Sequence, residues 1–458
     1  MGKNKKGIHL KTTQIIALGF LAMIIVGAIL LTLPAASVSG ESTPFVDALF
    51  TATSASCVTG LVTVTTAEHW SYFGQAVILF MIQFGGLGVV SFTTFLLIFL
   101  GKRINIKQRL LIQEAYSFDT MTGLVRMVIK MMKGTLIVEG VGAVLYMLVF
   151  IPDYGLKGIW MSIFTSISAF CNAGLDLIGG QSLTPYVGNP VINMVTMALI
   201  VIGGIGFLVW WDIIGLVKKL RARAMGFKQA VRELSLHTKV VLIFTIGLIV
   251  IGAVLVFCIE YTNPKTLGPL GLGSKIWASF FQSVTLRTAG FLTIDQGVLR
   301  NGTLLMGILW MFIGGSPGGT AGGVKTMTIA LLVVAVVSML KGREDVEIGG
   351  RRISYQLVTK GISVIIIQLG LWIVSTFLVC AVESNFSFIQ ILYETTSALG
   401  TVGLTMGITP SLSVIGKILI ALTMYLGRIG PITLAMAFNM ANRRKKFHRR
   451  MPEGKVIV

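Results

Sequence analysis

One local pattern occurs four times in this chain, at nearly equal intervals. In each copy a short, partly polar helical segment runs into a turn of small residues around a glycine, and these glycines are Gly60, Gly174, Gly290 and Gly403. The surrounding sequence is strongly apolar. Non-helical backbone at membrane depth is tolerated only where it is buried in protein or lines a water-filled cavity, so the four turns are expected to converge on one wet path.

The composition indicates an integral membrane protein. Hydrophobic residues make up 54% of the 458 residues and charged residues only 12%, which is too little charge for the surface of a soluble protein of this length. Apolar runs of about 18 residues or more, long enough to span a bilayer, recur along the chain. The first run, 15–33, is too long for a signal peptide and is expected to be retained as a span.

The positive charge is distributed unevenly. The net charge is +20, and most of the 38 Lys and Arg residues lie in the segments 1–11, 101–133, 218–239, 341–360 and 443–455. Because an excess of Lys and Arg marks cytoplasmic loops, the pattern predicts a multi-pass protein of the plasma membrane with both termini in the cytoplasm. It favours membrane lipids over nucleic acid as the partner of this charge, and it leaves open a protein partner for part of the basic surface.

Each quarter of the chain has the same expected order of elements: a long apolar helix, a half-helix too short and too polar to span, and a second apolar helix. The expected ranges are 12–34, 44–56 and 72–100; 125–151, 158–170 and 188–217; 239–260, 274–286 and 302–340; and 357–382, 386–399 and 412–440. The predicted fold is an all-α polytopic membrane protein with four helix–pore-loop–helix repeats around a single central pore, built from eight full spans and four re-entrant pore helices. The expected units are repeat 1 at 1–104, repeat 2 with a cytoplasmic linker at 105–220, repeat 3 with an intramembrane gating loop at 221–342, and repeat 4 with a basic cytoplasmic tail at 343–458.

The four turns are interpreted as a filter for a cation. A ring of backbone loops can replace the water around a metal ion with carbonyl oxygens, and the negative end of each helix dipole favours a cation. Glycine is needed where carbonyls must face one axis, because a side chain would block the approach. No turn contains the complete Thr-Val-Gly-Tyr-Gly string of tetrameric potassium channels. The candidate filter residues are Cys57, Val58, Thr59, Gly60, Cys171, Asn172, Ala173, Gly174, Thr288, Ala289, Gly290, Thr401, Val402 and Gly403.

A glycine-rich segment, 314–326, interrupts the second apolar helix of the third quarter. Its six glycines and one proline cannot continue a stable helix. We interpret it as a flexible loop below the filter that blocks or opens the ion path; a passive helix break is the alternative. A phosphate-binding loop is disfavoured, because Val324 separates Gly323 from Lys325 and no strand precedes the segment. The candidate gate residues in this loop are Gly314, Gly315, Ser316, Pro317, Gly318, Gly319, Thr320, Ala321, Gly322, Gly323 and Lys325.

Two arginines lie at membrane depth. Arg428 replaces a glycine in the last of four glycine clusters, which otherwise indicate close helix packing, and an intramembrane arginine marks a functional position by default. We expect Arg428 to complete the gate by repelling cations below the filter and by holding the 314–326 loop through hydrogen bonds to its carbonyls; a structural ion pair is the alternative. Arg287 precedes the third turn and is expected to point behind the filter, toward one of the acids Asp47, Glu260 and Glu394.

The single-glycine turns, the 314–326 loop and the Gly-Arg-Ile-Gly-Pro string at 427–431 together resemble the Trk/Ktr/HKT superfamily of potassium transporters, most closely the membrane subunits of Ktr systems. The resemblance covers essentially the whole chain. It implies potassium uptake, a homodimer with one pore per protomer, and a cytosolic ring of nucleotide-binding regulatory (RCK-type) subunits, which would dock on the basic internal loops and tail, including 443–446. Gly60 implies potassium selectivity, because relatives with serine in the first filter tend to favour sodium.

The leading hypothesis is a gated potassium pathway rather than an enzyme. Potassium is the expected substrate, bound at the filter carbonyls, sodium is a candidate activator, and no cofactor is expected in this chain. The alternative within the superfamily is a sodium-coupled or sodium-permeable cation carrier. A carrier with inverted repeats is disfavoured because the four repeats run parallel. A primary pump would need a partner, because the chain has no nucleotide or phosphorylation domain.

Overall fold

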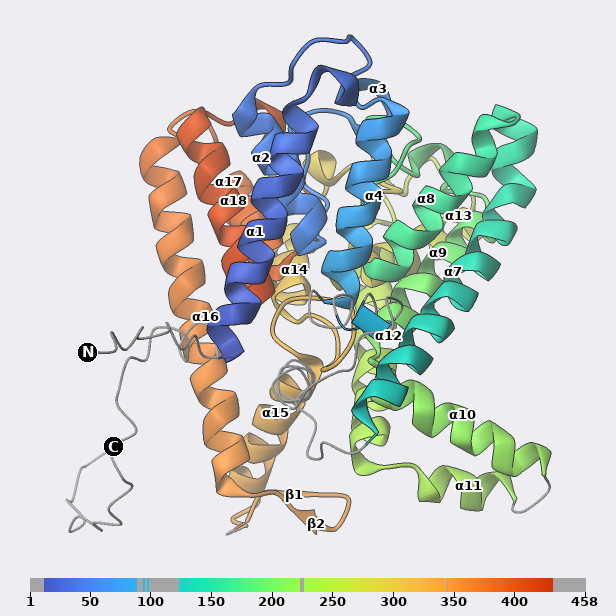
Figure 1. Ribbon diagram of the computed structural model, residues 1–458. Coiled ribbons are helices and arrows are strands. Elements are labelled where there is room, and N and C mark those ends of the chain that lie inside the picture. Colours follow the sequence, from blue (N-terminus) through green and yellow to red (C-terminus); the bar gives the residue numbers. More distant parts are fainter. Residues whose placement is uncertain are drawn as a thin grey trace, which may run out of the picture.

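The structure is a computed structural model that describes residues 12–88, 94, 97–98, 123–222, 226–343 and 345–430. Their regular structure is almost entirely helical (Figure 1). The strands β1 (Glu347–Ile348) and β2 (Arg351–Arg352) form a short antiparallel ribbon. The basic segments 1–11 and 443–455, the first part of 101–133 and the end of the last expected helix lie outside the described residues.

The helices follow the expected order in every quarter. Repeat 1 contains α1 (Thr12–Thr32), α2 (Phe45–Cys57), the single turn α3 (Thr66–His69) and α4 (Tyr72–Leu87). Repeat 2 contains α7 (Leu124–Tyr154), α8 (Lys157–Cys171), α9 (Pro190–Gly204) and α10 (Phe207–Arg221), and α11 (Phe227–Glu233) follows. Repeat 3 contains α12 (Leu236–Glu260), α13 (Leu272–Thr285), α14 (Asn301–Phe312) and α15 (Thr326–Leu340). Repeat 4 contains α16 (Tyr355–Val382), α17 (Phe388–Gly400) and α18 (Val414–Ile429). Short 3-10 turns in the connections are η1 (Pro34–Ala36), η2 (Thr184–Tyr186), η3 (Gln296–Val298) and η4 (Thr409–Ser411).

Local sequence explains where the second helices of three repeats begin. Ser71 and Ser413 are the N-caps of α4 and α18, and their hydroxyls accept hydrogen bonds from the backbone N–H groups of Gly74 and Gly416 at 3.3 and 3.0 Å. Asn189 caps α9 in the same way and is followed by a proline, which suits the first position of a helix. These caps start each second helix shortly after the glycine turn that precedes it.

The first helix of each repeat has the surface of a membrane span. α1, α7, α12 and α16 are the helices in the described part of the chain that are individually long and apolar enough to cross a bilayer. Large apolar side chains are exposed along them, among them Val26, Leu148, Ile243 and Phe377. By contrast, the half-helices α2, α8, α13 and α17 are largely buried. The protein is therefore a mostly helical, multi-pass membrane-type structure in which the short helices lie inside.

The second helices depart from the expected ranges. The expected continuous helix at 188–217 is wrong, because the chain bends by 105° between α9 and α10. α10 and α11 run sideways out of the bundle, at the end where β1 and β2 also lie (Figure 1). α14 and α15 are separated by the glycine-rich segment, as expected. Four described helices, or five if the bent pair counts as one, are long enough to span. The prediction of eight full spans thus depends on the shorter second helices.

Candidate functional site

All four half-helices lead into the same strained backbone turn. Val58, Asn172, Thr288 and Thr401 have positive φ angles of 57°, 61°, 65° and 51°, and each lies two residues before its repeated glycine. The β-branched residues Val58, Thr288 and Thr401 rarely adopt this conformation, which costs of the order of 1–3 kcal/mol per residue, whereas Asn172 adopts it more readily. The same conformation at the same position in four separate segments indicates that the turn geometry serves a function.

Backbone hydrogen bonds close three of these turns identically. Thr59, Ala173 and Val402 each donate an N–H group to a serine carbonyl five residues earlier, at Ser54, Ser168 and Ser397, and all three distances are 2.8 Å. The third turn is tighter: Ala289 donates to Thr285, four residues earlier, at 3.0 Å. The fourfold similarity is therefore approximate, and the third repeat differs.

In two turns a serine side chain also holds the glycine. The hydroxyls of Ser54 and Ser397 accept hydrogen bonds from the N–H groups of Gly60 and Gly403, each at 3.0 Å. These bonds direct the glycine N–H groups back toward their own half-helices. The carbonyls of the turns are left for other contacts.

The four glycines form a closed ring. A Cβ atom built on Gly60 would lie 2.6 Å from the carbonyl oxygen of Ala173, and one on Gly174 would lie 2.6 Å from that of Ala289. A Cβ on Gly290 would lie 2.6 Å from the carbonyl oxygen of Val402, and one on Gly403 would meet that of Thr59. Each glycine thus faces the backbone of the next repeat, and the last returns to the first. Their φ angles are also positive, at 103°, 67°, 83° and 92°.

Glycines in the second helices allow close packing behind this ring. A Cβ atom on Gly85, Gly203 or Gly427 would collide with the carbonyl oxygen of Ser56, Phe170 or Leu399, respectively. Each of these carbonyls lies four residues before the ring glycine of its own repeat. The glycine clusters of repeats 1, 2 and 4 therefore let the second helix touch the end of its half-helix, as expected from close packing.

The 314–326 segment lies directly against the turns. Thr320 donates its N–H to Gly203 O at 3.1 Å and its hydroxyl to Phe170 O at 3.1 Å, which ties the segment to repeat 2. A Cβ atom on Gly322 would collide with the hydroxyl of Thr401 in the fourth turn. The segment therefore contacts the ends of two half-helices.

Further hydrogen bonds join the segment to the bend of repeat 2 and to itself. Ser316 N–H donates to Gly204 O at 2.9 Å, and Phe207 N–H donates to Gly318 O at 3.1 Å. Lys325 Nζ donates to Ala321 O at 2.7 Å within the segment. Its backbone is thus ordered by defined contacts, several of which come from another repeat.

Arg428 connects this segment to repeat 1. Its Nη1 donates to Thr320 O at 2.6 Å, and its Nη2 donates to Gly85 O and, at 3.3 Å, to Gly86 O. The guanidinium group therefore bridges two carbonyl groups of α4 and one of the 314–326 segment. These contacts agree with the expected hydrogen bonds from Arg428 to the loop.

The expectation of an acidic partner for Arg287 is wrong. Arg287 is 7% exposed, and its Nη2 donates to Thr326 Oγ1 at 3.4 Å, while its Nε has no hydrogen-bond partner among the described residues. The three acids are engaged elsewhere. Asp47 pairs with Lys417 at 2.7 Å, Glu260 accepts from Asn263, Thr266, Thr303 and the Arg300 N–H, and Glu394 accepts from Thr405 and Thr409. Arg287 instead lines a cavity of about 10 Å³ beside the 314–326 segment, with room for about one water molecule.

The side chains of the site offer no resident metal centre. Within the described residues no group of three or more His, Cys, Asp or Glu side chains could hold a metal ion. Cys57 and Cys171, the last residues of α2 and α8, are buried free thiols. Backbone carbonyls lie at the ring, and the turns also contain the buried hydroxyls of Thr59, Thr288 and Thr401, which have no hydrogen-bond partner in the described part of the chain.

The sequence also matches a known protein family over nearly its whole length. Residues 8–449 match the family described as TrkH, cation transport protein. The chain belongs to this TrkH family.

The relatives of this TrkH-family chain match over nearly their whole length. It is 39% identical to the Ktr system potassium uptake protein B of Bacillus subtilis, over 99% of this chain and 98% of the relative. It is also 39% identical to the potassium/sodium uptake protein NtpJ of Enterococcus hirae, over 98% of both. Its fold is similar to that of TrkH from Vibrio parahaemolyticus, with a TM-score of 0.70 at 16% identity, over 94% of this chain and 86% of that one.

Sequence reasoning missed several residues that this TrkH-family structure brings to the site. Ser54 and Ser397 were not singled out, although both lie six residues before a ring glycine, a spacing that an alignment of the four turns would have revealed. Glu139 was also missed. Its signal was a single acidic residue deep within the apolar run of α7.

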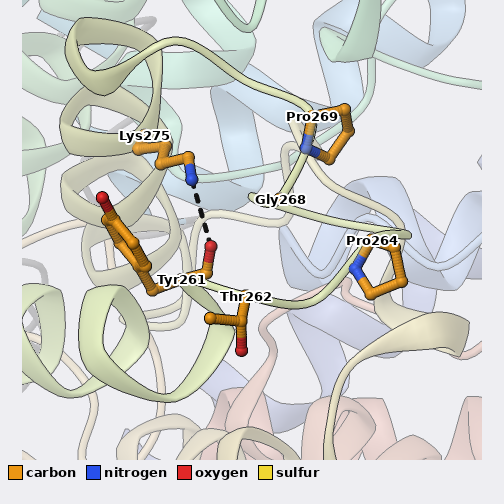
Figure 2. Close-up of a pocket in the computed structure, with 6 residues that line it drawn as sticks. All are labelled: Tyr261, Thr262, Pro264, Gly268, Pro269 and Lys275. Atoms are coloured by element: carbon orange, nitrogen blue, oxygen red, sulfur yellow. Dashed lines mark hydrogen bonds between the residues drawn. The ribbon is translucent and has the colours of Figure 1, made fainter.

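A larger cavity lies away from the ring, beyond the end of α12 (Figure 2). It has a volume of about 470 Å³ and is lined by Tyr261, Thr262, Pro264, Gly268, Pro269 and Lys275. Lys275 Nζ donates to Tyr261 O at 3.1 Å and lies 4.0 Å from the centre of the Tyr261 ring. A lysine in this position stabilises the carboxyl end of a helix, so the contact of Lys275 is explained by local capping.

Proposed function

We propose that this chain is the membrane subunit of a potassium-uptake system and that K⁺ crosses the membrane through the ring of four glycine turns. The main support is the closed ring, in which each glycine faces the carbonyl of the next repeat. The names of its relatives, a potassium uptake protein of B. subtilis and a potassium/sodium uptake protein of E. hirae, agree with this substrate class.

The proposed filter acts through its backbone. Carbonyl oxygens of the four turns would replace the hydration shell of K⁺, at the carboxyl ends of four half-helices whose dipoles favour a cation. The buried hydroxyls of Thr59, Thr288 and Thr401, which have no partner among the residues that the structure describes, fit a site whose remaining partners are water and ions. The membrane potential would drive uptake with about 2.3 kcal/mol per charge per 100 mV.

The proposed gate consists of the 314–326 segment and Arg428. The segment contacts the ends of α8 and α17, and Arg428 fixes it to α4 through three carbonyl groups. In this arrangement the arginine places a positive charge beside the path of a cation. Movement of the segment away from the ring would open that path.

The remaining features of the proposal concern topology and partners. Both termini lie in the cytoplasm, the chain forms a homodimer, and cytosolic nucleotide-binding subunits dock on its basic side. Two protein names support a multi-component system, since Ktr system potassium uptake proteins B and D of B. subtilis are 39% and 32% identical to this chain. K⁺ is the substrate, Na⁺ is a candidate activator, and the chain itself carries no cofactor.

A second candidate function is sodium-permeable or sodium-coupled cation uptake. The observation in its favour is the E. hirae relative, whose name includes both ions and whose identity equals that of the B. subtilis protein. Uptake of K⁺ and Na⁺, measured separately in proteoliposomes, distinguishes the two candidates.

The first prediction tests the filter with Gly60→Ser. The new Cβ would lie 2.6 Å from Ala173 O, so the first and second turns must separate and the carbonyl ring loses its shape. We expect the ratio of K⁺ to Na⁺ uptake in proteoliposomes to fall toward equality. An unchanged ratio in a variant that incorporates normally would refute the filter assignment.

The second prediction tests the gate by removing residues 318–319 from the tip of the segment. This deletion removes the Gly318 carbonyl that accepts from Phe207 N–H, and it removes the close approach of Gly319 to the carbonyls of Gly203 and Gly204. The segment then loses these attachments to the bend of repeat 2. We expect shortening to raise ion flux and to leave the ratio of K⁺ to Na⁺ uptake unchanged, because the turns themselves are untouched. Lower flux would instead mean that the segment is a scaffold.

A further inference from the structure

An acidic side chain lies inside the helix bundle, behind the second turn. Glu139 is near the middle of α7, and only 4% of its surface is exposed. It shares the inner face of α7 with Thr135, Gly142 and Tyr146. Among the described residues it has no ion-pair partner. Ionisable residues at this depth are costly and indicate function by default.

Glu139 is attached to the second half-helix at two points. Its backbone carbonyl accepts a hydrogen bond from the hydroxyl of Ser166 in α8 at 2.6 Å. Its carboxylate lies 3.9 Å from the thiol of Cys171, the last residue of α8. Gln83 of α4 completes the cluster, because its Nε2 donates to the carboxylate at 3.1 Å and its Oε1 lies 3.6 Å from the same thiol.

The thiol of Cys171 has little room to move. On its other side, a Cβ atom built on Gly86 would lie 2.6 Å from Cys171 Sγ. The next residue, Asn172, adopts the left-handed conformation that begins the second turn, and Gly174 follows in the ring. A displacement of the Glu139 carboxylate therefore acts on the residue from which this turn starts.

The same end of α4 contacts the proposed gate. Arg428 donates to the carbonyls of Gly85 and Gly86, three residues or fewer from Gln83. The last turn of α4 thus contacts the Glu139 cluster through Gln83. It contacts the guanidinium group of Arg428 through the carbonyls of Gly85 and Gly86. Any movement of Arg428 that shifts this turn reaches the carboxylate cluster.

Packing alone does not require an acid at this junction. In repeat 3 the hydroxyl of Ser283 donates to the backbone carbonyl of Ile249 at 2.8 Å, which repeats the contact between Ser166 and Glu139. The residue there is a half-buried aliphatic one, and the same hydrogen bond forms without an acid. The carboxylate of Glu139 is therefore an addition that the corresponding junction of repeat 3 lacks.

We propose that Glu139 is a positioning residue for ion selection: through Cys171 and Gln83, its carboxylate holds the second turn of the ring in register with the end of α4 that Arg428 binds. This inference rests on the proposed filter. It assigns to the filter an intramembrane support that differs between repeats.

The test compares Glu139→Leu with Glu139→Gln in proteoliposomes. Leucine imitates the aliphatic residue of repeat 3, so we expect normal incorporation and melting temperature but a ratio of K⁺ to Na⁺ uptake lower by about threefold or more. Glutamine keeps a hydrogen-bond acceptor for Gln83, and we expect it to retain most of the ratio. In the Cys171→Ala background, Glu139→Leu should have a much smaller effect, because the two residues act in one chain of contacts.

Tyr146→Phe is the matched control. It removes another buried hydrogen bond from the same face of α7, the 2.6 Å contact with Thr196, two turns away from Glu139. It should leave the uptake ratio unchanged. An unchanged ratio in Glu139→Leu, or an equal loss in Tyr146→Phe, would reduce Glu139 to a packing residue.

Two further outcomes can be distinguished from a failure of this inference. If Glu139→Leu does not fold, Gln83→Leu removes the amide that aims the carboxylate and should lower the ratio; an unchanged ratio overturns the inference. Failure of the filter itself appears differently, as a lack of K⁺ preference in the unmodified protein or as no effect of Gly60→Ser.

Discussion

At each ring glycine, the missing side chain is what brings neighbouring repeats together. The atoms that a Cβ would meet are backbone atoms of the next turn, which cannot move aside as the end of a flexible side chain can. In every repeat this contact is paired with a positive φ angle at the residue two positions earlier. The turns are therefore constrained twice, by their own backbone and by their neighbours.

The third prediction follows for Gly174→Ala. Its Cβ would lie 2.6 Å from Ala289 O and 2.7 Å from Gly290 Cα, so the second and third turns must move apart. We expect K⁺ uptake to fall by about tenfold or more, which corresponds to ~1.4 kcal/mol in the barrier to transport. The measurement is the initial rate of K⁺ uptake at equal amounts of incorporated protein.

Gly40→Ala is the control for this substitution. Gly40 also has a positive φ, at 72°, but a Cβ there has no neighbour within 4 Å. It should lose about 1–2 kcal/mol of stability from backbone strain alone and keep normal uptake. Equal uptake by both variants would mean that the contacts between turns do not matter for transport.

At the scale of elements, the bend that ends α9 is tied to the 314–326 segment. The bend between α9 and α10 occurs at Gly206, whose φ is 91°, and the next residue, Phe207, donates its N–H to the carbonyl of Gly318. The bend is thus stabilised by a segment more than a hundred residues away in the chain. The same end of α9 carries the carbonyls that bind Ser316 and Thr320.

The fourth prediction compares two adjacent glycines of α9. A Cβ on Gly203 would collide with Phe170 O and lie 2.9 Å from Thr320 Oγ1, whereas the nearest atoms to a Cβ on Gly204 are 3.6 and 3.7 Å away. We expect Gly203→Ala to destabilise the protein by about 1–3 kcal/mol and to disturb uptake. Gly204→Ala should stay within about 1 kcal/mol of the unmodified protein. Thermal unfolding in detergent measures both, and equal melting temperatures would show that α9 does not pack tightly on α8.

At the scale of the whole molecule, hydropathy and turn residues were sufficient to predict the order of helices in each repeat. The half-helix α8, for example, was expected at 158–170 and extends over Lys157–Cys171. The bend after α9 was missed because the apolar sequence continues through 207–217, and a hydropathy pattern carries no information about direction. The partner of Arg287 was missed for a related reason: charge alone suggested an acid, but its contact is the hydroxyl of Thr326, which folding brings near from another helix. The ring glycines were identified because each is marked locally by its turn.

Closure of the ring requires the first and last repeats to meet. Asp47, in the first turn of α2, and Lys417, near the start of α18, form an ion pair at 2.7 Å with side chains only 17% and 15% exposed. An apolar cluster that includes Ile24, Phe50 and Ile420 joins the same two repeats. Polar and apolar contacts therefore both hold the ends of the chain together.

The fifth prediction tests how much of this closure is due to the ion pair and how much to the apolar cluster. Lys417→Met leaves a mostly buried carboxylate without its partner, so we expect a loss of about 2 kcal/mol, between the values typical of exposed and fully buried pairs. Asp47→Lys should be worse, since two positive charges would then face each other, and adding Lys417→Asp should recover part of the loss. Recovery will be incomplete, because an acid suits the amino-terminal turn of α2 and a lysine does not. If the reversed pair melts no higher than Asp47→Lys alone, the ion pair contributes little, and the apolar cluster of repeats 1 and 4 keeps the glycine ring closed.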